Sequence, residues 1–288
     1  MKKTFFSIII PTLNEERYLP LLLKDLSRQT FQKDLFEIVH IDGKSEDKTI
    51  AKAKEFANKL NIKTITSSKR NVSWQRNMGG ELASSKWIIF MDADNRLPAY
   101  FLDGLKYQLA KNPTTDIFTT WLAVTKPTSL EGSIARVLNL GLEVYSATSK
   151  PSAFGAMIGV KKNIFEKIKF DPSQKFMEDA LFVNQVCKTG ANFKIFQEPR
   201  YVFSMRRFEK EGTLKFVGNN ALLQLKYLQG KDFKNEESYK MLGGSYYDQI
   251  SPTLFKNLIS QLKKAPAKQI ELTKKILRRI NAQLDNLY

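Results

Sequence analysis

Residues 86–95 read KWIIFMDADN, an apolar run that ends in two aspartates, Asp92 and Asp94. A short apolar run bounded by polar residues is typical of a strand that is buried on both faces. Such strands belong to mostly parallel sheets, and open sheets of this kind bind ligands at the carboxyl ends of their strands. This stretch therefore predicts an α/β fold with both aspartates on its functional edge.

The rest of the first half repeats this pattern, since apolar runs alternate with segments of helical period. Strands are predicted at residues 5–10, 36–41, 63–66 and 86–91, and helices at 18–26, 50–60 and 75–83. Pro11 is expected to end the first strand. Polar residues follow three of the strands, at 12–15, 42–47 and 92–94, and we expect them to converge on one rim of the sheet.

Composition sets wide limits on function. The chain has 288 residues, of which 42% are hydrophobic, and a formal net charge of +17. This charge attracts nucleic acid, anionic lipid or phosphorylated substrates, and by itself it does not choose among them. The single cysteine, Cys187, excludes an internal disulfide and a cysteine-cluster zinc site, and is expected to be a buried, inert thiol.

The amino terminus, MKKTFFSIIIPTLNEE, resembles a signal peptide only superficially, because its apolar stretch lasts about eight residues before a proline and two glutamates. Nowhere do about 18 apolar residues run uninterrupted, so no membrane-spanning helix is predicted. The expected location is the cytoplasm, with the inner face of the cell membrane as an alternative.

Glycine-rich phosphate loops are absent from the sequence, since neither GxxxxGK[ST] nor GxGxxG occurs. This disfavours a P-loop ATPase and an ordinary dinucleotide-binding fold. The remaining interpretation is that this edge of the sheet forms a nucleotide site without a P-loop.

Four segments in chain order resemble one known family. They are SIIIPTLNEE (7–16), IVHIDGKSEDKT (38–49), RNMGGELASSKWIIFMDADNRLP (76–98) and FDPSQKFMEDALF (170–182). Together they resemble the GT-A glycosyltransferases of family 2, which use nucleotide-sugar donors. The resemblance covers roughly residues 5–208 and implies a Rossmann-like, mostly parallel sheet flanked by helices. It divides the chain into a catalytic domain, 1–212, with a donor half (1–97) and an acceptor half (98–212), and a basic helical extension, 213–288.

The resemblance implies that Asp94, assisted by Asp92, binds Mn²⁺ or Mg²⁺. Carboxylate oxygens suit these hard cations, which proteins commonly hold by one or two carboxylates together with substrate phosphates. The cation would neutralise the charge that develops on the departing diphosphate. A solvated turn is the alternative for an isolated DxD sequence.

The resemblance also implies a set of donor contacts, each with a structural alternative. For Asp42, with Ser45 and Asp47, the alternative is that they cap the following helix. Arg76 is suited to surface salt bridges, and the arginine pair 206–207 to a solvated basic surface. His40 is expected to be a packed core residue. The predicted donor-binding residues are Pro11, Thr12, Glu15, Asp42, Arg76, Asp92, Arg206 and Arg207.

Glu178 and Asp179 are the candidates for the base that takes a proton from the acceptor hydroxyl. Successive helical residues point about 100° apart, so at most one of them faces the reacting carbon. The resemblance selects Asp179 as the base and Glu178 as the residue that orients the acceptor or the base. This scheme predicts inversion at the anomeric carbon. The alternative is an acid pair that the helix macrodipole favours.

The extension ends in basic amphipathic sequence, with eight lysines and arginines against two acids in the last 36 residues. Such helices bind an anionic membrane or pack on their own domain. The predicted function is non-processive, metal-dependent, inverting transfer from a nucleotide sugar to a glycan or lipid-linked hydroxyl. A UDP-sugar is favoured, with a GDP-sugar as the alternative. Competing hypotheses are a nucleotidyltransferase, an inactive membrane-surface scaffold and a nucleic-acid-binding protein, although no nucleic-acid motif is recognisable.

Overall fold

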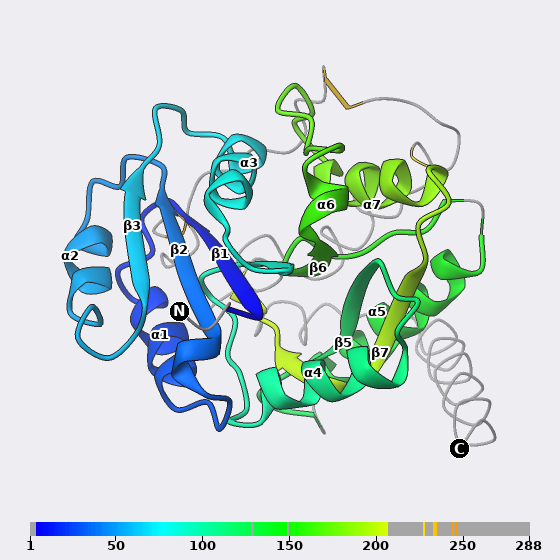
Figure 1. The fold of residues 1–288 in the computed structure, drawn as a ribbon, viewed down its shortest axis with the longest axis horizontal. Coiled ribbons are helices and arrows are strands. Elements are labelled where there is room, and N and C mark those ends of the chain that lie inside the picture. The colour runs from blue at the N-terminus through cyan, green and yellow to red at the C-terminus, as the bar shows by residue number, and fades with distance from the viewer. Residues whose placement is uncertain are drawn as a thin grey trace, which may run out of the picture.

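In the computed structural model, the described residues are 4–127, 130–148 and 150–206, with the single residues Tyr227, Phe233, Lys234, Gly244 and Tyr246. Within them, a seven-stranded sheet in the order β3-β2-β1-β4-β6-β5-β7 forms the centre of the fold (Figure 1). The strands are β1 Phe6–Thr12, β2 Phe36–Asp42, β3 Ile62–Thr66, β4 Trp87–Met91, β5 Ile117–Ala123, β6 Met157–Lys161 and β7 Phe193–Val202. The helices are α1 Leu19–Ser27, α2 Thr49–Lys54, α3 Val72–Leu82, α4 Phe101–Lys111, α5 Leu130–Ser146, α6 Lys162–Phe165 and α7 Glu178–Lys188, with a short 3₁₀ helix at Lys33–Leu35.

The predicted α/β fold with a mostly parallel sheet is confirmed. Strands β3, β2, β1 and β4 run parallel to one another, as do β5 and β7. Only β6, among the described strands, runs antiparallel to both of its neighbours, β4 and β5. The four predicted strands all form, within two residues of their expected ends.

The prediction that Pro11 ends the first strand is wrong. Strand β1 pairs with β2 as far as Thr12, but with β4 only as far as Ile9. Proline has no N–H to donate, so it is tolerated in a strand where no neighbour needs that bond. Pro11 therefore lies buried inside β1, and the polar turn begins one residue later than its position suggested.

Two of the predicted helices differ from their expected bounds. Helix α2 ends at Lys54, whereas the apolar period predicted a helix as far as residue 60, and the residues between form turns instead. Helix α3 begins earlier than predicted because Asn71 caps it, with the side-chain oxygen accepting a bond from the N–H of Trp74 at 2.9 Å. Gly79 lets α3 approach the sheet, since a Cβ there would lie 2.2 Å from Ile9.

Helices cover both faces of the sheet and form a three-layer α/β/α arrangement (Figure 1). One core lies between the sheet and helices α1, α2, α4 and α5, and includes Leu22 and Leu105. The second lies between the sheet and helices α3, α6 and α7, and is rich in phenylalanine rings such as Phe90 and Phe182. Both faces of β1 and β4 are thereby buried, which explains their continuous apolar sequence.

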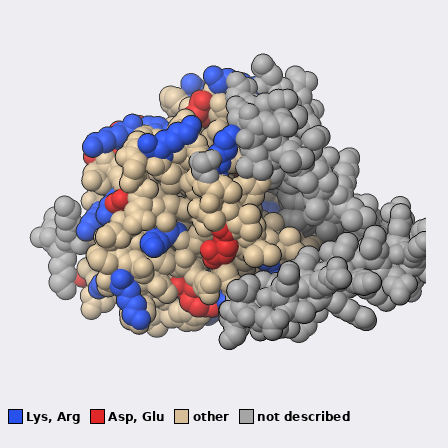
Figure 2. Space-filling model, turned by 90° about the vertical axis from the view of Figure 1, so that its right-hand side faces the viewer, with Lys and Arg blue, Asp and Glu red and all other residues tan. Residues whose placement is uncertain are grey.

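Basic side chains lie in separate groups on the face of the molecule shown in Figure 2, with neutral surface and some acidic side chains between them. A protein that tracks a nucleic-acid backbone presents a continuous basic stripe instead. The described part of this face gives no support to the nucleic-acid hypothesis. None of the described helices is both long and apolar enough to cross a bilayer.

Candidate active site

Two loops at the carboxyl ends of β1 and β2 are joined by hydrogen bonds from backbone to side chain. The left-handed backbone of Asn14 (φ 55°) turns the first loop toward the second. The N–H groups of Asn14, Glu15 and Glu16 donate to the side chains of Ser45, Thr49 and Asp47 at 2.8, 2.8 and 3.0 Å. These three side chains therefore fix the loops, which supports the structural role that the sequence allowed for Ser45 and Asp47.

Asp42 lies at the end of β2 and is fully buried. Its carboxylate accepts bonds from the Thr12 hydroxyl at 2.9 Å and from the N–H and hydroxyl of Ser45 at 2.8 and 2.6 Å. A carboxylate has about four acceptor positions. Three of them are used in the turn, so about one is left for a nucleotide base, and nucleotide contact by Asp42 and Thr12 stays a prediction.

His40 is a buried core residue, as predicted. Its Nε2 lies 2.8 Å from the Thr12 hydroxyl and its Nδ1 lies 3.2 Å from the Thr64 hydroxyl. Burial lowers the pKa of His40 to about 4, against a smaller opposing effect of Asp42. The imidazole is therefore neutral at physiological pH and supports Thr12 by a hydrogen bond.

Arg76 joins the DxD turn after β4 to the start of α7. The guanidinium is buried, with 3% of the side chain exposed, so the surface salt bridge considered for it is wrong. It donates to Glu178 at 2.9 Å, to Asp92 at 3.2 Å and to the carbonyl of Gly155 at 3.2 Å. One side chain thus fixes the spacing between the DxD turn and the start of α7.

Asp179 stands beside this bridge in the first turn of α7. Met177, in the left-handed region at φ 58°, places Glu178 and Asp179 at the beginning of the helix. The Asp179 carboxylate accepts bonds from the N–H of Gly155 at 2.6 Å and of Ala180 at 2.7 Å. Part of this side chain reaches the surface, whereas Glu178 is buried against Arg76. The two adjacent acids therefore have different surroundings, and Asp179 is the more exposed of the two.

The pKa of Asp179 is raised to about 7. Burial is the largest cause and the charge of Glu178 adds to it, while Arg76 and the two backbone N–H groups act in the opposite direction. A carboxylate whose pKa lies near physiological pH is suited to take up and release a proton.

Arg206 forms a second ion cluster, between the loop after β1 and the DxD turn. Its guanidinium donates to Asp94 at 2.7 Å and to both oxygens of Glu15 at 3.1 Å, and it stacks over the Tyr18 ring at 3.9 Å. Burial is the largest influence on its pKa and lowers it, but the carboxylates Asp94 and Glu15 outweigh it, so the pKa is raised. Arg207, its predicted companion, lies outside the described residues.

The edge of the sheet therefore gathers predicted residues from both halves of the chain into two linked clusters. The family model "Glycosyl transferase family 2" matches residues 7–169. The chain belongs to glycosyl transferase family 2. The matched range contains Arg76 and the DxD turn, and it ends just before the segment with Glu178 and Asp179.

Several curated relatives are similar in sequence to this chain. The poly(ribitol-phosphate) β-N-acetylglucosaminyltransferase TarP of Staphylococcus aureus is 25% identical over 265 residues, which cover 85% of this chain and 78% of TarP. TarS, which carries the same enzyme name and also comes from Staphylococcus aureus, is 24% identical over 82% of this chain. That match covers 42% of TarS, so the chain spans less than half of this relative.

Solved family structures share the fold. Staphylococcus aureus TarS 1–349 in complex with UDP superposes with a TM-score of 0.55 at 21% identity, over 72% of this chain and 62% of that one. The mannosyltransferase PcManGT of Pyrobaculum calidifontis, in complex with GDP-Man and Mn²⁺, gives 0.59 at 19% identity, over 71% and 58%. At these identities the likeness supports the GT-A fold alone.

The carboxylates of this family 2 site fit a divalent cation that is shared with a ligand. The linked clusters hold five acids, Glu15, Asp92, Asp94, Glu178 and Asp179, and two guanidinium groups, Arg76 and Arg206, in a protein of net charge +17. The described residues contain no group of three or more acid, histidine or cysteine side chains arranged to hold a metal by themselves. Asp92 and Asp94, with 39% and 21% of their side chains exposed, offer two oxygen ligands of the kind that Mn²⁺ and Mg²⁺ share with phosphates.

Gly244 is a site residue that the sequence reasoning missed, because the resemblance fades beyond residue 212. Its N–H donates to the carbonyl of Leu13 at 2.8 Å, and its own carbonyl lies 3.5 Å from Nη1 of Arg206. A Cβ at this position would lie 2.4 Å from the carboxyl carbon of Glu15. The signal in the sequence was the Gly243-Gly244 pair within a segment of helical period.

Replacing Gly244 with alanine is expected to weaken nucleotide binding. The added methyl group must displace the Glu15 carboxylate, and with it the Arg206 cluster. We expect the dissociation constant of UDP to rise roughly tenfold, which corresponds to about 1.4 kcal/mol. Titration calorimetry with Mn²⁺ present measures it. Gly141→Ala is the matched control, because a Cβ in that open position meets nothing within 4 Å. Equal losses in both variants would contradict the prediction.

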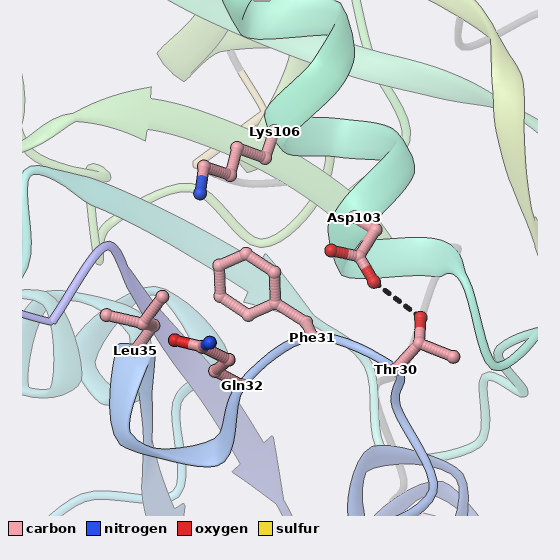
Figure 3. Close-up of a pocket in the computed structure, with 6 residues that line it drawn as sticks. All are labelled: Thr30, Phe31, Gln32, Leu35, Asp103 and Lys106. Atoms are coloured by element: carbon pink, nitrogen blue, oxygen red, sulfur yellow. Dashed lines mark hydrogen bonds between the residues drawn. The ribbon is translucent and has the colours of Figure 1, made fainter.

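A pocket of about 310 Å³ lies at the opposite edge of the sheet (Figure 3). Leu35 directly precedes β2, so the pocket is at the amino end of that strand, whereas the two ion clusters lie at the carboxyl ends of the strands. The Asp103 carboxylate accepts a hydrogen bond from the Thr30 hydroxyl, and the Lys106 ammonium stands 5.6 Å from the Phe31 ring. None of the predicted site residues lines this pocket.

Proposed function

We propose that the protein transfers a sugar from a nucleotide-diphospho sugar to a hydroxyl group, with inversion at the anomeric carbon and with a divalent cation. The observation that carries this proposal is the Arg76 bridge, because it brings the DxD turn and the Glu178–Asp179 pair to one place. The family 2 match over residues 7–169 supports the reaction class.

The proposed base is Asp179, whose carboxylate would accept the proton of the acceptor hydroxyl as that oxygen attacks the anomeric carbon. Two backbone N–H groups hold this carboxylate, and its pKa of about 7 suits the task. Glu178 is proposed to act indirectly, because its pairing with Arg76 fixes the start of α7.

The proposed holders of the donor diphosphate are Arg206 and the cation site at Asp92 and Asp94. A bound Mn²⁺ or Mg²⁺ would supply Lewis-acid neutralisation of the charge on the departing diphosphate. Arg206 already contacts Asp94 and Glu15, and its planar guanidinium is suited to bidentate contact with phosphate. Pro11, Thr12 and Asp42 are proposed to border the base and ribose.

The proposed donor is a UDP-sugar, and UDP-N-acetylglucosamine is the first one to test. TarP and TarS are both named N-acetylglucosaminyltransferases, and a TarS structure holds UDP-GlcNAc. A GDP-sugar is the alternative, since the PcManGT structure holds GDP-Man.

The proposed acceptor is a hydroxyl of a glycan or of a lipid-linked glycan, and a polyol-phosphate polymer is the first to test. The relatives TarP and TarS are named for poly(ribitol-phosphate). A net charge of +17 favours encounter with such a polyanion. We also propose that the chain divides into a catalytic domain, 1–212, and an extension, 213–288, and that the extension contributes to acceptor binding. Its amphipathic segments, and the membrane contact predicted for them, lie outside the described residues.

The test is a thermal-shift series with UDP, GDP and UDP-N-acetylglucosamine, with and without Mn²⁺. A ligand that binds only the native state raises the melting temperature, and at about 100 times its Kd adds about 2.7 kcal/mol. We expect a shift that requires Mn²⁺ and one nucleotide, followed by transfer to an acceptor. Binding without any release of UDP would favour the scaffold hypothesis instead.

Asp94→Asn is expected to remove the Mn²⁺ dependence of the UDP shift, because an amide is a weaker cation ligand than a carboxylate. The variant should still fold, since Asp94 is partly exposed and Arg206 keeps its contact with Glu15. The control is Asp116→Asn, which removes a carboxylate paired with Lys161 away from the site. An unchanged Mn²⁺ requirement in Asp94→Asn would refute the proposed ligand role.

A further inference from the structure

Tyr201, near the end of β7, carries a buried hydroxyl that the mechanism above does not use. Its side chain is 0% exposed, and its hydroxyl oxygen has no hydrogen-bond partner among the described residues. Buried tyrosine hydroxyls usually find a partner, because an unpaired one loses its bond to water without compensation. Phenylalanine would fill the same space without this cost.

Tyr201 belongs to the same buried core as Ala93, the residue between Asp92 and Asp94. The residue after Tyr201, Val202, exchanges two backbone hydrogen bonds with Arg96, at 2.8 and 3.0 Å, just beyond the DxD turn. Burial raises the pKa of Tyr201, and the nearby charges of Asp92, Asp179 and Asp94 raise it further. The hydroxyl therefore keeps its proton and is a hydrogen-bond donor close to three acceptors.

The two arginines explain why this donor has no hydrogen-bond partner among the described residues. Arg76 holds Asp92 and Arg206 holds Asp94, so both carboxylates of the turn are drawn to guanidinium groups. A bound diphosphate competes with Asp94 for Arg206, whereas Arg76 is buried against Glu178 and keeps its contact with Asp92. Once Arg206 turns toward phosphate, Asp94 loses this donor.

We propose that Tyr201 is a positioning residue, whose hydroxyl donates a hydrogen bond to the turn of Asp92 and Asp94 when the nucleotide diphosphate is bound. This inference rests on the proposed function, because it assumes that a diphosphate occupies the site. It assigns Tyr201 to donor affinity and not to the stability of the ligand-free fold.

Tyr201→Phe tests the proposal with two readouts of opposite sign. Without ligand, the melting temperature should rise by roughly 2–4 °C, because an unpaired buried hydroxyl is removed. With Mn²⁺ present, the dissociation constant of UDP in titration calorimetry should rise roughly tenfold to a hundredfold, which is what a hydrogen bond to a charged group is worth. The melting-temperature shift that UDP causes should shrink accordingly.

Two tyrosines provide matched controls. Tyr107 on α4 is 57% exposed, so Tyr107→Phe should change neither readout. The Tyr227 hydroxyl lies 3.3 Å from the carbonyl oxygens of both Pro151 and Ala180, to which it can donate a hydrogen bond. Tyr227→Phe removes this bond and should therefore lower the melting temperature.

The outcomes separate this inference from the proposed function. If the unaltered protein binds neither UDP nor GDP, the proposed function fails and Tyr201 has no such role. If the unaltered protein binds UDP and Tyr201→Phe binds it equally well, only the inference about Tyr201 fails. A lower melting temperature in Tyr201→Phe would also overturn it, because the hydroxyl would then have a partner in the ligand-free fold.

Discussion

Asp179→Asn is expected to lower the rate of sugar transfer by roughly 10²- to 10⁴-fold, the usual contribution of a general base. Asparagine keeps the size of the side chain and an oxygen to accept one backbone N–H, but it cannot take a proton. The proposed donor contacts are made by other residues, so the dissociation constant of UDP should stay within about threefold of its original value. Steady-state kinetics together with UDP titration separate these two effects.

The pH dependence of the unaltered protein gives an independent check on the same assignment. A base acts in its ionised form, and the pKa of Asp179 is about 7. The value of kcat/KM should therefore rise with pH and level off above about 7. With an ordinary aspartate as the base, the same rise would be centred at about 4. Asp103→Asn, on the exposed side of α4, is the control. A loss of UDP binding in Asp179→Asn without a loss of turnover would refute the role of base.

Arg76→Met is expected to destabilise the fold by about 3–5 kcal/mol, which corresponds to a fall in melting temperature on the order of 10 °C. The guanidinium is 3% exposed and its partner Glu178 is 6% exposed, so its removal leaves a buried carboxylate without a counter-charge. Turnover should fall as well, since the same bridge spaces the DxD turn from Asp179. Denaturant unfolding measures the first effect and kinetics the second.

An exposed ion pair supplies the control for Arg76. Arg70 pairs with Glu46 on the surface, with 47% and 74% of the two side chains exposed, and Arg70→Met should cost only about 0–1 kcal/mol. Adding Glu178→Gln to Arg76→Met should recover part of the stability, because the unpaired charge is then gone. Equal stability of Arg76→Met and Arg70→Met would contradict the structural role of the bridge.

Local sequence predicted most of what lies on one strand or one turn. The apolar runs of β1, β2 and β4 are buried on both faces, so their hydrophobicity alone revealed them, and parallel packing placed the polar residues after them on one edge. The order of four motifs identified the family. Sequence reasoning failed at Pro11, because whether a strand tolerates proline depends on whether a neighbouring strand needs its N–H, and at α2, whose apolar period continues through turns.

The amino-acid sequence by itself determined the α/β class, the DxD turn, the acid pair at the start of α7 and the core role of His40. These features depend on local pattern and on buried apolar area. Only the tertiary structure decided which charges meet. Arg76 is 102 residues from Glu178 and Arg206 is 112 residues from Asp94, yet both pairs are in hydrogen-bond contact. Pairing between distant residues follows from how the elements pack around β1 and β4, which no periodicity in the sequence encodes. The same packing leaves the Tyr201 hydroxyl without a hydrogen-bond partner among the described residues.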